Sequence, residues 1–101
     1  MPAYVIVDIH IHDLAAYEEY KPTAHETIMQ YGGRYLARGG AAEQLEGTRQ
    51  PSRIVILGFP SAEQARAWWN APEYAEAKAL RHRIATTEML LVEGLEAPAP
   101  R

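Results

Sequence analysis

The sequence predicts an α+β fold with elements in the order strand, helix, strand, strand, helix, strand. One observation behind this prediction is an alternating apolar pattern near the N-terminus, which is typical of a strand. A second is the recurrence of apolar residues at helical spacing in two long segments. A third is the continuous apolar run RIVILGF, which indicates a buried central strand. The 101 residues are enough for one domain and too few for two.

The first strand is predicted over residues 3–12, AYVIVDIHIH. Successive side chains of a strand point to opposite faces, so one face of this strand is aliphatic and carries Val5, Val7, Ile9 and Ile11. The other face carries Tyr4, Ile6, Asp8, His10 and His12.

The first helix is predicted from an N-cap at Asp13 to the glycine pair Gly32 and Gly33. One of the two glycines is expected in the left-handed conformation that ends many helices. Pro22 has no backbone N–H to donate, so we expect it to kink this helix or split it in two.

The second strand is predicted in residues 34–40, RYLARGG, with Arg34, Leu36 and Arg38 on one face. Residues 41–52 contain turn formers and are expected to form a hairpin-like excursion. The third strand covers residues 53–59 and is expected at the centre of the sheet.

The second helical region begins with a capping-box pattern, in which Ser61 precedes Gln64 by three residues. Pro72 can start a further helical segment because proline is tolerated at the first helical position. The last strand is predicted over residues 86–95, TTEMLLVEGL.

This order of elements is that of a ferredoxin-like βαββαβ fold with an antiparallel sheet. Its helices cover one face of the sheet, and the other face carries Ile6, Ile54 and Ile56, which are too apolar to leave in water. A second copy of the sheet is the simplest cover, so we expect a homodimer through the sheet faces. Residues 1–95 are expected to form a single domain, and residues 96–101 a flexible C-terminal tail.

Composition excludes several classes of function. The formal net charge of −3 and the scattered basic residues argue against a nucleic-acid partner. The chain has no cysteine, which removes disulfides and thiolate chemistry. No stretch is long and apolar enough for a membrane span, and the N-terminus lacks the features of a signal peptide, so a cytoplasmic location is expected.

Three segments together resemble the domain-of-unknown-function 1330 family: YGGRYLARGG, FPSAEQARAWWNAPEYAEAKALR and LLVEG. The resemblance runs from about residue 3 to residue 95. It implies a dimeric α+β barrel, in which two sheets pack face to face around a cavity, and a strand order of 4-1-3-2. It implies no reaction, although the wider superfamily includes cofactor-free monooxygenases, muconolactone isomerase-like enzymes and haem-binding proteins.

The motif Asp8-x-His10-x-His12 places three polar side chains on one face of the first strand. One hypothesis makes His10 a general base that Asp8 orients. A second makes the three residues metal ligands, although no second cluster completes such a site, and no metal is expected. A third is that His12 lies in solvent at the strand end and His10 only makes a hydrogen bond.

Arg38 precedes a glycine pair and is the second candidate for chemistry. Its guanidinium could bind a carboxylate or enolate oxygen bidentately. The alternative is an ion pair with Glu93 or Glu43 that closes the edge of a dimer.

The cavity is predicted to be lined by Tyr4, Ile6, Ile54, Ile56, Trp69 and Glu93. Trp68 and Trp69 lie about 100° apart on a helix, so one should pack inward and the other at a boundary, where it could also cover a pocket. His25 and His82 are expected on the surface.

The sequence leaves three functions open. The first is a cofactor-independent isomerase or monooxygenase-like enzyme acting on a small carbonyl-bearing or aromatic acid, with His10, Asp8 and Arg38 as its catalytic residues. The second is a protein that binds such an acid without turnover, and the third is a purely structural dimer. No phosphate-binding loop or dinucleotide fingerprint is present, and no cofactor is expected.

Overall fold

The computed structural model describes residues 1–95, and the predicted C-terminal tail lies outside the described residues. Within this range, seven elements follow one another along the chain: β1 (Ala3–Ile11), α1 (Leu14–Gln30), β2 (Arg34–Arg38), β3 (Arg53–Phe59), α2 (Ala62–Trp69), α3 (Pro72–Ile84) and β4 (Ala85–Glu93). The predicted order is confirmed, with the second helical region formed by the two helices α2 and α3.

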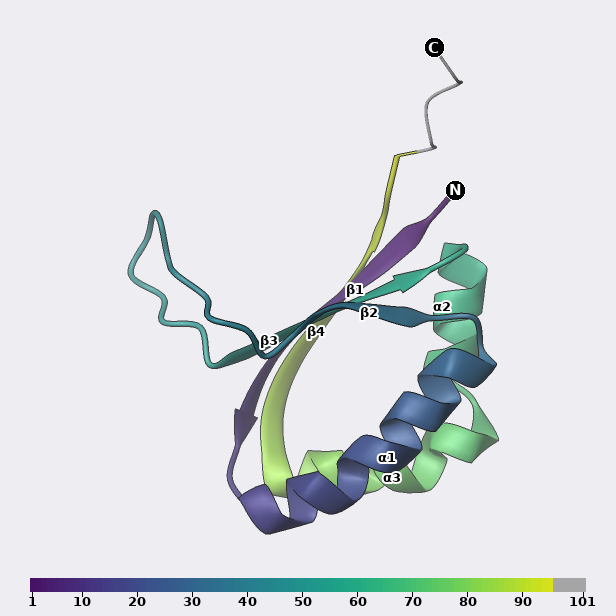
Figure 1. The fold of residues 1–101 in the computed structure, drawn as a ribbon, viewed down its shortest axis with the longest axis horizontal. Coiled ribbons are helices and arrows are strands. Elements are labelled where there is room, and N and C mark those ends of the chain that lie inside the picture. Colours follow the sequence, from purple (N-terminus) through teal and green to yellow (C-terminus); the bar gives the residue numbers. More distant parts are fainter. Residues whose placement is uncertain (96–101) are drawn as a thin grey trace.

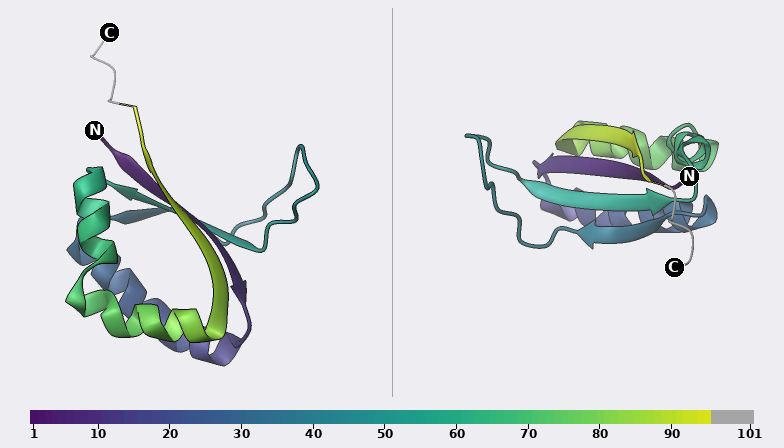
Figure 2. Two further views of the ribbon diagram at one scale, coloured as in Figure 1. Left: turned by 180° about the vertical axis from the view of Figure 1, so that it is seen from behind. Right: turned by 90° about the horizontal axis from the view of Figure 1, so that it is seen from above.

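The four strands form one antiparallel sheet in the order β2-β3-β1-β4, which confirms the predicted strand order. All three helices cover the same face of this twisted sheet (Figure 1). We call this face the inner face and the opposite one the outer face. Seen from above, the strands form one layer with the helices behind it, and the loop between β2 and β3 extends beyond the sheet (Figure 2). Within residues 1–95, no helix is long and apolar enough to cross a membrane.

Local sequence explains where the helices begin. Asp13 accepts a hydrogen bond from the backbone N–H of Ala16, as expected of an N-cap, and Ser61 accepts from the N–H of Gln64. The Gln64 side chain donates to the carbonyl of Tyr31, so it ties the start of α2 to the end of α1.

The predicted split of the first helix at Pro22 is wrong, because α1 runs unbroken from Leu14 to Gln30. Pro22 is exposed, so water can reach the carbonyl that loses its intrahelical partner. Buried residues on both sides of the proline, including Tyr20 and Ala24, pack in one core and hold the two halves together.

The predicted alternation along the second strand also needs correction. Tyr35 pairs with Leu57 and Ala37 pairs with Ile56, so Leu36 is an extra residue that forms a β-bulge. Beyond the bulge, Arg38 pairs with Val55 and faces inward, on the side opposite to Leu36. A one-residue insertion moves every later side chain to the other face.

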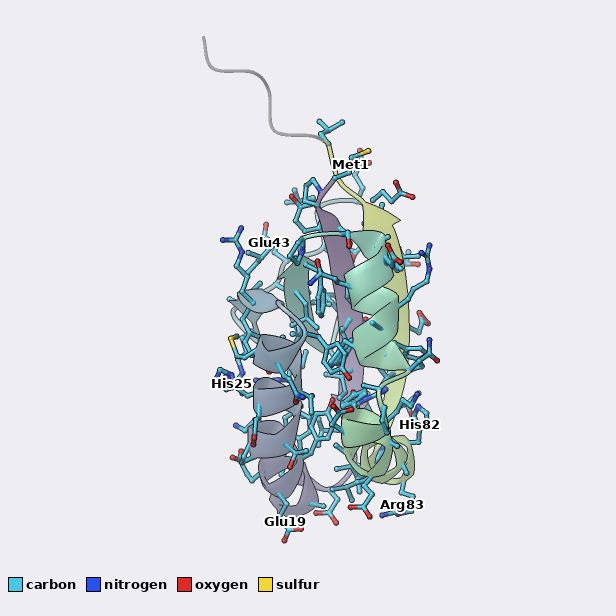
Figure 3. All side chains as sticks on the ribbon, turned by 90° about the vertical axis from the view of Figure 1, so that its right-hand side faces the viewer. Met1, Glu19, His25, Glu43, His82 and Arg83 are labelled. Carbon is cyan, nitrogen blue, oxygen red and sulfur yellow. The ribbon has the colours of Figure 1, made fainter. Side chains whose placement is uncertain are left out.

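The core lies between the inner face and the helices, and its largest fully buried side chains are Trp68, Tyr74 and Leu57. Trp69 is half-buried, so the predicted division of roles between the two tryptophans is confirmed. The surface positions predicted for His25 and His82 are also confirmed, and the two residues lie on opposite sides of the molecule, on α1 and α3 (Figure 3).

Candidate functional site

A small cavity of about 40 Å³ lies between the inner face and the helices. By the usual volume of a buried water, it has room for roughly three water molecules. Each strand and each helix contributes to its lining, which consists of Val7, Ile9, Tyr17, Tyr20, Lys21, Ala24, Ile28, Tyr35, Arg38, Val55, Leu57, Trp68, Arg81 and Met89.

Arg81 is the most unusual residue of this lining, because its side chain is only 2% exposed. Helix α3 buries one residue on every turn, and the other members of the buried stripe are Tyr74, Ala77 and Ile84. Arg81 thus occupies a position that helical periodicity reserves for an apolar residue. Arg81 is not among the residues predicted from the sequence, although this break in the apolar stripe of residues 72–84 is visible there.

The guanidinium of Arg81 lacks a counterion within the part of the chain that the structure describes. Its Nε donates a long hydrogen bond of 3.4 Å to the hydroxyl of Tyr74, and its Nη2 is buried without any hydrogen-bond partner. A buried charge that is neither paired nor fully hydrogen-bonded is costly. An anion beside Arg81 would remove this cost.

Tyr20 and Tyr74 add a second donor to the site. Their hydroxyl oxygens lie 2.6 Å apart, and one hydroxyl donates to the other. The pair has two O–H protons and shares one hydrogen bond, so the second proton finds no acceptor among residues 1–95. If Tyr74 donates to Tyr20, the O–H of Tyr20 is free to donate into the cavity that Tyr20 lines.

Burial and the neighbouring Tyr74 raise the pKa of Tyr20 far above its usual value. Tyr20 therefore stays protonated at neutral pH, so it can donate a hydrogen bond but is unsuited to act as a base. Together with Arg81, it gives the cavity an excess of donors.

Cations gather at the β2 side of the cavity. The guanidinium of Arg38 lies 4.2 Å from the ring centroid of Tyr35, and that of Arg53 lies 5.6 Å from the ring centroid of Tyr17. Lys21 lines the cavity as well and forms an ion pair of 3.1 Å with Glu18 on the same helix. Clustered cations raise the local concentration of anions, even in a protein with negative net charge.

The Arg-Gly-Gly sequence at the end of β2 has a structural reason. Gly39 has φ +72°, a left-handed conformation that favours glycine, and its N–H donates to the carbonyl of Ile54. A Cβ at Gly39 would overlap the guanidinium of Arg53, whereas a Cβ at Gly40 would meet no atom within 4 Å. The first glycine thus lets Arg53 lie beside the backbone.

The predicted catalytic residues lie on both sides of the sheet. His10 and Asp8 are on the outer face, while Arg38 faces the cavity on the inner face. Asp8 accepts hydrogen bonds from the Arg49 guanidinium and, at 3.1 Å, from the N–H of Ser52, so it anchors the loop between β2 and β3. The roles predicted for His10 and Asp8 in catalysis stay predictions.

The second histidine of the motif contacts the neighbouring strand. His12 lies 2.8 Å through Nε2 from the hydroxyl of Thr86, and the His10 and His12 ring centroids are 4.9 Å apart. In the described part of the chain, no group of three or more His, Asp or Glu side chains is arranged to hold a metal ion.

The residues predicted to line a cavity are placed as follows. Tyr4, Ile6, Ile54 and Ile56 belong to the outer face, and Ile6 and Ile54 border a shallow depression there. Glu93 is exposed at the end of β4. Trp69 lines a groove beside α2 on the inner face.

The fold and the helix-covered cavity define a protein of the ferredoxin-like α+β class. The model of a domain of unknown function, DUF1330, matches residues 2–95, and the chain belongs to this family. No curated protein is significantly similar to the chain in sequence.

Three solved structures illustrate the likeness of fold. A protein of unknown function from Rhodopseudomonas palustris, RPA0582, has a TM-score of 0.76 and 17% identity, covering 95% of this chain and 84% of that one. SnoaB, a cofactor-independent oxygenase from Streptomyces nogalater, has a TM-score of 0.64 and 11% identity over 98% of each chain. A dimeric ferredoxin-like protein of unknown function from Jannaschia sp. CCS1 has a TM-score of 0.63 and 12% identity, covering 93% of this chain and all of the other.

Proposed function

We propose that this protein is a homodimer that binds a small organic acid in the cavity between its sheet and its helices. The observation that carries the proposal is the buried, unpaired guanidinium of Arg81. A carboxylate is the natural partner of a guanidinium, because two parallel N–H···O hydrogen bonds match the geometry of both groups. The cavity itself has room for the carboxylate head group, and the aromatic rings around it suit a carbonyl or aromatic group next to the carboxylate.

The donor excess supports the choice of an anionic ligand. Arg81 Nη2 and one phenolic proton of the Tyr20–Tyr74 pair lack acceptors within residues 1–95. Carboxylate, carbonyl and enolate oxygens accept hydrogen bonds without donating any. A cationic amine would leave both donors unpaired and add repulsion with Arg38 and Lys21.

The geometry favours binding over proton abstraction. Donors such as Tyr20 and Arg81 could stabilise an enolate, which is what a cofactor-independent isomerase or monooxygenase-like enzyme needs. Such an enzyme also needs a base, and the cavity lining includes no carboxylate or imidazole. The predicted base, His10, is on the outer face of the sheet. Binding without turnover is therefore the preferred function, and catalysis is the second candidate.

The outer face supports the homodimer. It exposes large apolar side chains, namely Ile6 (37% exposed), Leu36 (46%), Leu90 (61%) and Val92 (41%). Adjacent apolar residues on a sheet face that no helix covers are typical of an interface. A second copy, packed face to face, would bury them in both protomers.

The proposal is tested by calorimetric titration with benzoate, phenylpyruvate and 2-oxobutyrate, alongside benzamide as an uncharged control. We expect saturable binding of at least one acid, no binding of benzamide, and loss of acid binding in Arg81→Met. Circular dichroism would check that the variant is folded. Equal affinity of wild type and a folded Arg81→Met for every acid would refute the proposal. A search for turnover of the bound acid, with His10→Ala for comparison, would then test the catalytic alternative.

A further inference from the structure

A groove of about 440 Å³ lies next to the cavity, between α2 and the edge strand β4. Its walls are mostly apolar and consist of Val5, Ala65, Arg66, Trp68, Trp69, Thr87, Met89 and Leu91. Typical ligand sites enclose roughly 300–1,000 Å³. The groove falls within this range, whereas the cavity of about 40 Å³ can hold only a head group.

Two side chains, Trp68 and Met89, line both the cavity and the groove. They therefore form the partition between the two spaces. Trp68 is held in place by two contacts. Its indole N–H donates to the hydroxyl of Thr27 at 3.2 Å, and its ring centroid lies 4.5 Å from that of Tyr74. Met89 is half-buried, unbranched and without such a tie, so it can change rotamer at little cost.

The Arg81 guanidinium also lies close to the groove. The Arg81 guanidinium, which lines the cavity, lies 5.8 Å from the ring centroid of Trp69, which lines the groove. On the groove wall, the hydroxyl of Thr87 is buried and has no hydrogen-bond partner. The groove thus borders a second polar atom without a partner, in addition to the nearby Arg81 guanidinium.

We propose that the cavity and the groove form one bipartite site, opened by movement of Met89, for a carboxylic acid with an extended apolar tail. The carboxylate lies against Arg81, and an aryl or short alkyl tail lies along Trp69 and Leu91 beneath α2. This inference rests on the proposed function, because it keeps the anion at Arg81. It adds the ligand class: acids whose apolar part extends several carbon atoms beyond the carboxylate.

The inference is tested by calorimetric titration of the full chain with acetate, benzoate, phenylacetate and 4-phenylbutyrate. Each further buried methylene should strengthen binding about three- to four-fold, so 4-phenylbutyrate should bind at least ten-fold more tightly than benzoate. In Leu91→Phe, which fills the groove, the advantage of 4-phenylbutyrate over benzoate should disappear while acetate binding stays. In Met89→Ala, which removes the partition, the advantage of 4-phenylbutyrate over benzoate should increase. Leu45→Phe, an exposed change in the loop between β2 and β3, is the matched control. It should leave the affinities for all four acids unchanged.

The possible failures have different meanings. Binding of all four acids with equal affinity, lost in Arg81→Met but unaffected by Leu91→Phe and Met89→Ala, would overturn the bipartite site and leave the proposed function standing. Absence of binding by any acid would overturn both. Since Leu91→Phe could disturb folding, Met89→Ala provides an independent test through the opposite change in volume.

Discussion

The hydroxyl of Tyr74 lies 2.6 Å from that of Tyr20 and accepts from Arg81 Nε at 3.4 Å. This short chain of polar atoms is buried between the helices and the sheet, where most neighbours are apolar. Buried polar atoms are normally satisfied, so the unpaired Nη2 of Arg81 is the reason for proposing a carboxylate ligand at this position.

Replacing Arg81 by methionine should stabilise the ligand-free protein while removing acid binding. The variant removes an unpaired buried charge and keeps much of the side-chain volume, and such exchanges are often neutral or stabilising by about 1–4 kcal/mol. Thermal unfolding without ligand measures the effect. Arg83→Met, at an exposed position on the same helix, is the control and should change the melting temperature little. A large loss of stability in Arg81→Met alone would argue for a structural role of the guanidinium.

The stability of the protein should fall with rising pH above about pH 10, in part because of Tyr20. Burial raises the pKa of Tyr20 in the folded state above that of the unfolded chain. Its contribution is therefore fully present below the unfolded pKa of about 10 and is lost as the pH rises towards the folded pKa. A buried tyrosine of this kind lowers the free energy of unfolding by at most about 1.4 kcal/mol for each pH unit. Urea unfolding of wild type and Tyr20→Phe between pH 9 and 11 should give a shallower decline for the variant, and parallel declines would contradict this assignment.

Asp8→Ala should loosen the loop between β2 and β3. Asp8 accepts from Arg49 and from the N–H of Ser52, and these bonds hold the loop against the outer face. Because Arg49 is more than half exposed, we expect a loss of only about 1 kcal/mol in unfolding free energy. Limited proteolysis should cut residues 40–50 several-fold faster than in wild type. Glu43→Ala, an exposed change in the same loop, serves for comparison.

Gly39→Ala should destabilise the fold, whereas Gly40→Ala should not. The left-handed backbone at Gly39 costs a non-glycine residue about 1–2 kcal/mol, and the new Cβ would push the Arg53 guanidinium aside. Gly40 has open space around the Cβ position. Chemical denaturation of the two variants measures the difference. Equal stability of the two would contradict the role assigned to Gly39.

Leu90→Glu should convert the proposed dimer to a monomer. Leu90 is 61% exposed on the outer face, and a carboxylate there would be buried opposite apolar residues of a second copy. Sedimentation of wild type should give twice the mass of one chain. Sedimentation of the variant should give the mass of one chain. Leu45→Glu, exposed in the loop, should leave the mass unchanged. A wild type that sediments as a monomer would reject the dimer itself.

Local patterns in the sequence determined most of the fold. The alternation in β1, the N-cap at Asp13, the central position of β3 and the helix start at Pro72 all follow from residues close together in the chain. Such features depend on backbone geometry and hydrophobic periodicity, which a short window of sequence contains.

The tertiary structure alone decided which polar groups meet. The bulge at Leu36 arises from pairing with β3 and turns Arg38 towards the cavity. The contact between Tyr20 and Tyr74 joins residues 54 positions apart in the sequence. The hydrogen bond between Asp8 and Arg49 joins residues 41 positions apart. Whether a buried charge such as Arg81 is paired depends on every element packed around it, and no local pattern carries that information. For this reason the elements could be predicted from the sequence, whereas the position of the cavity could not.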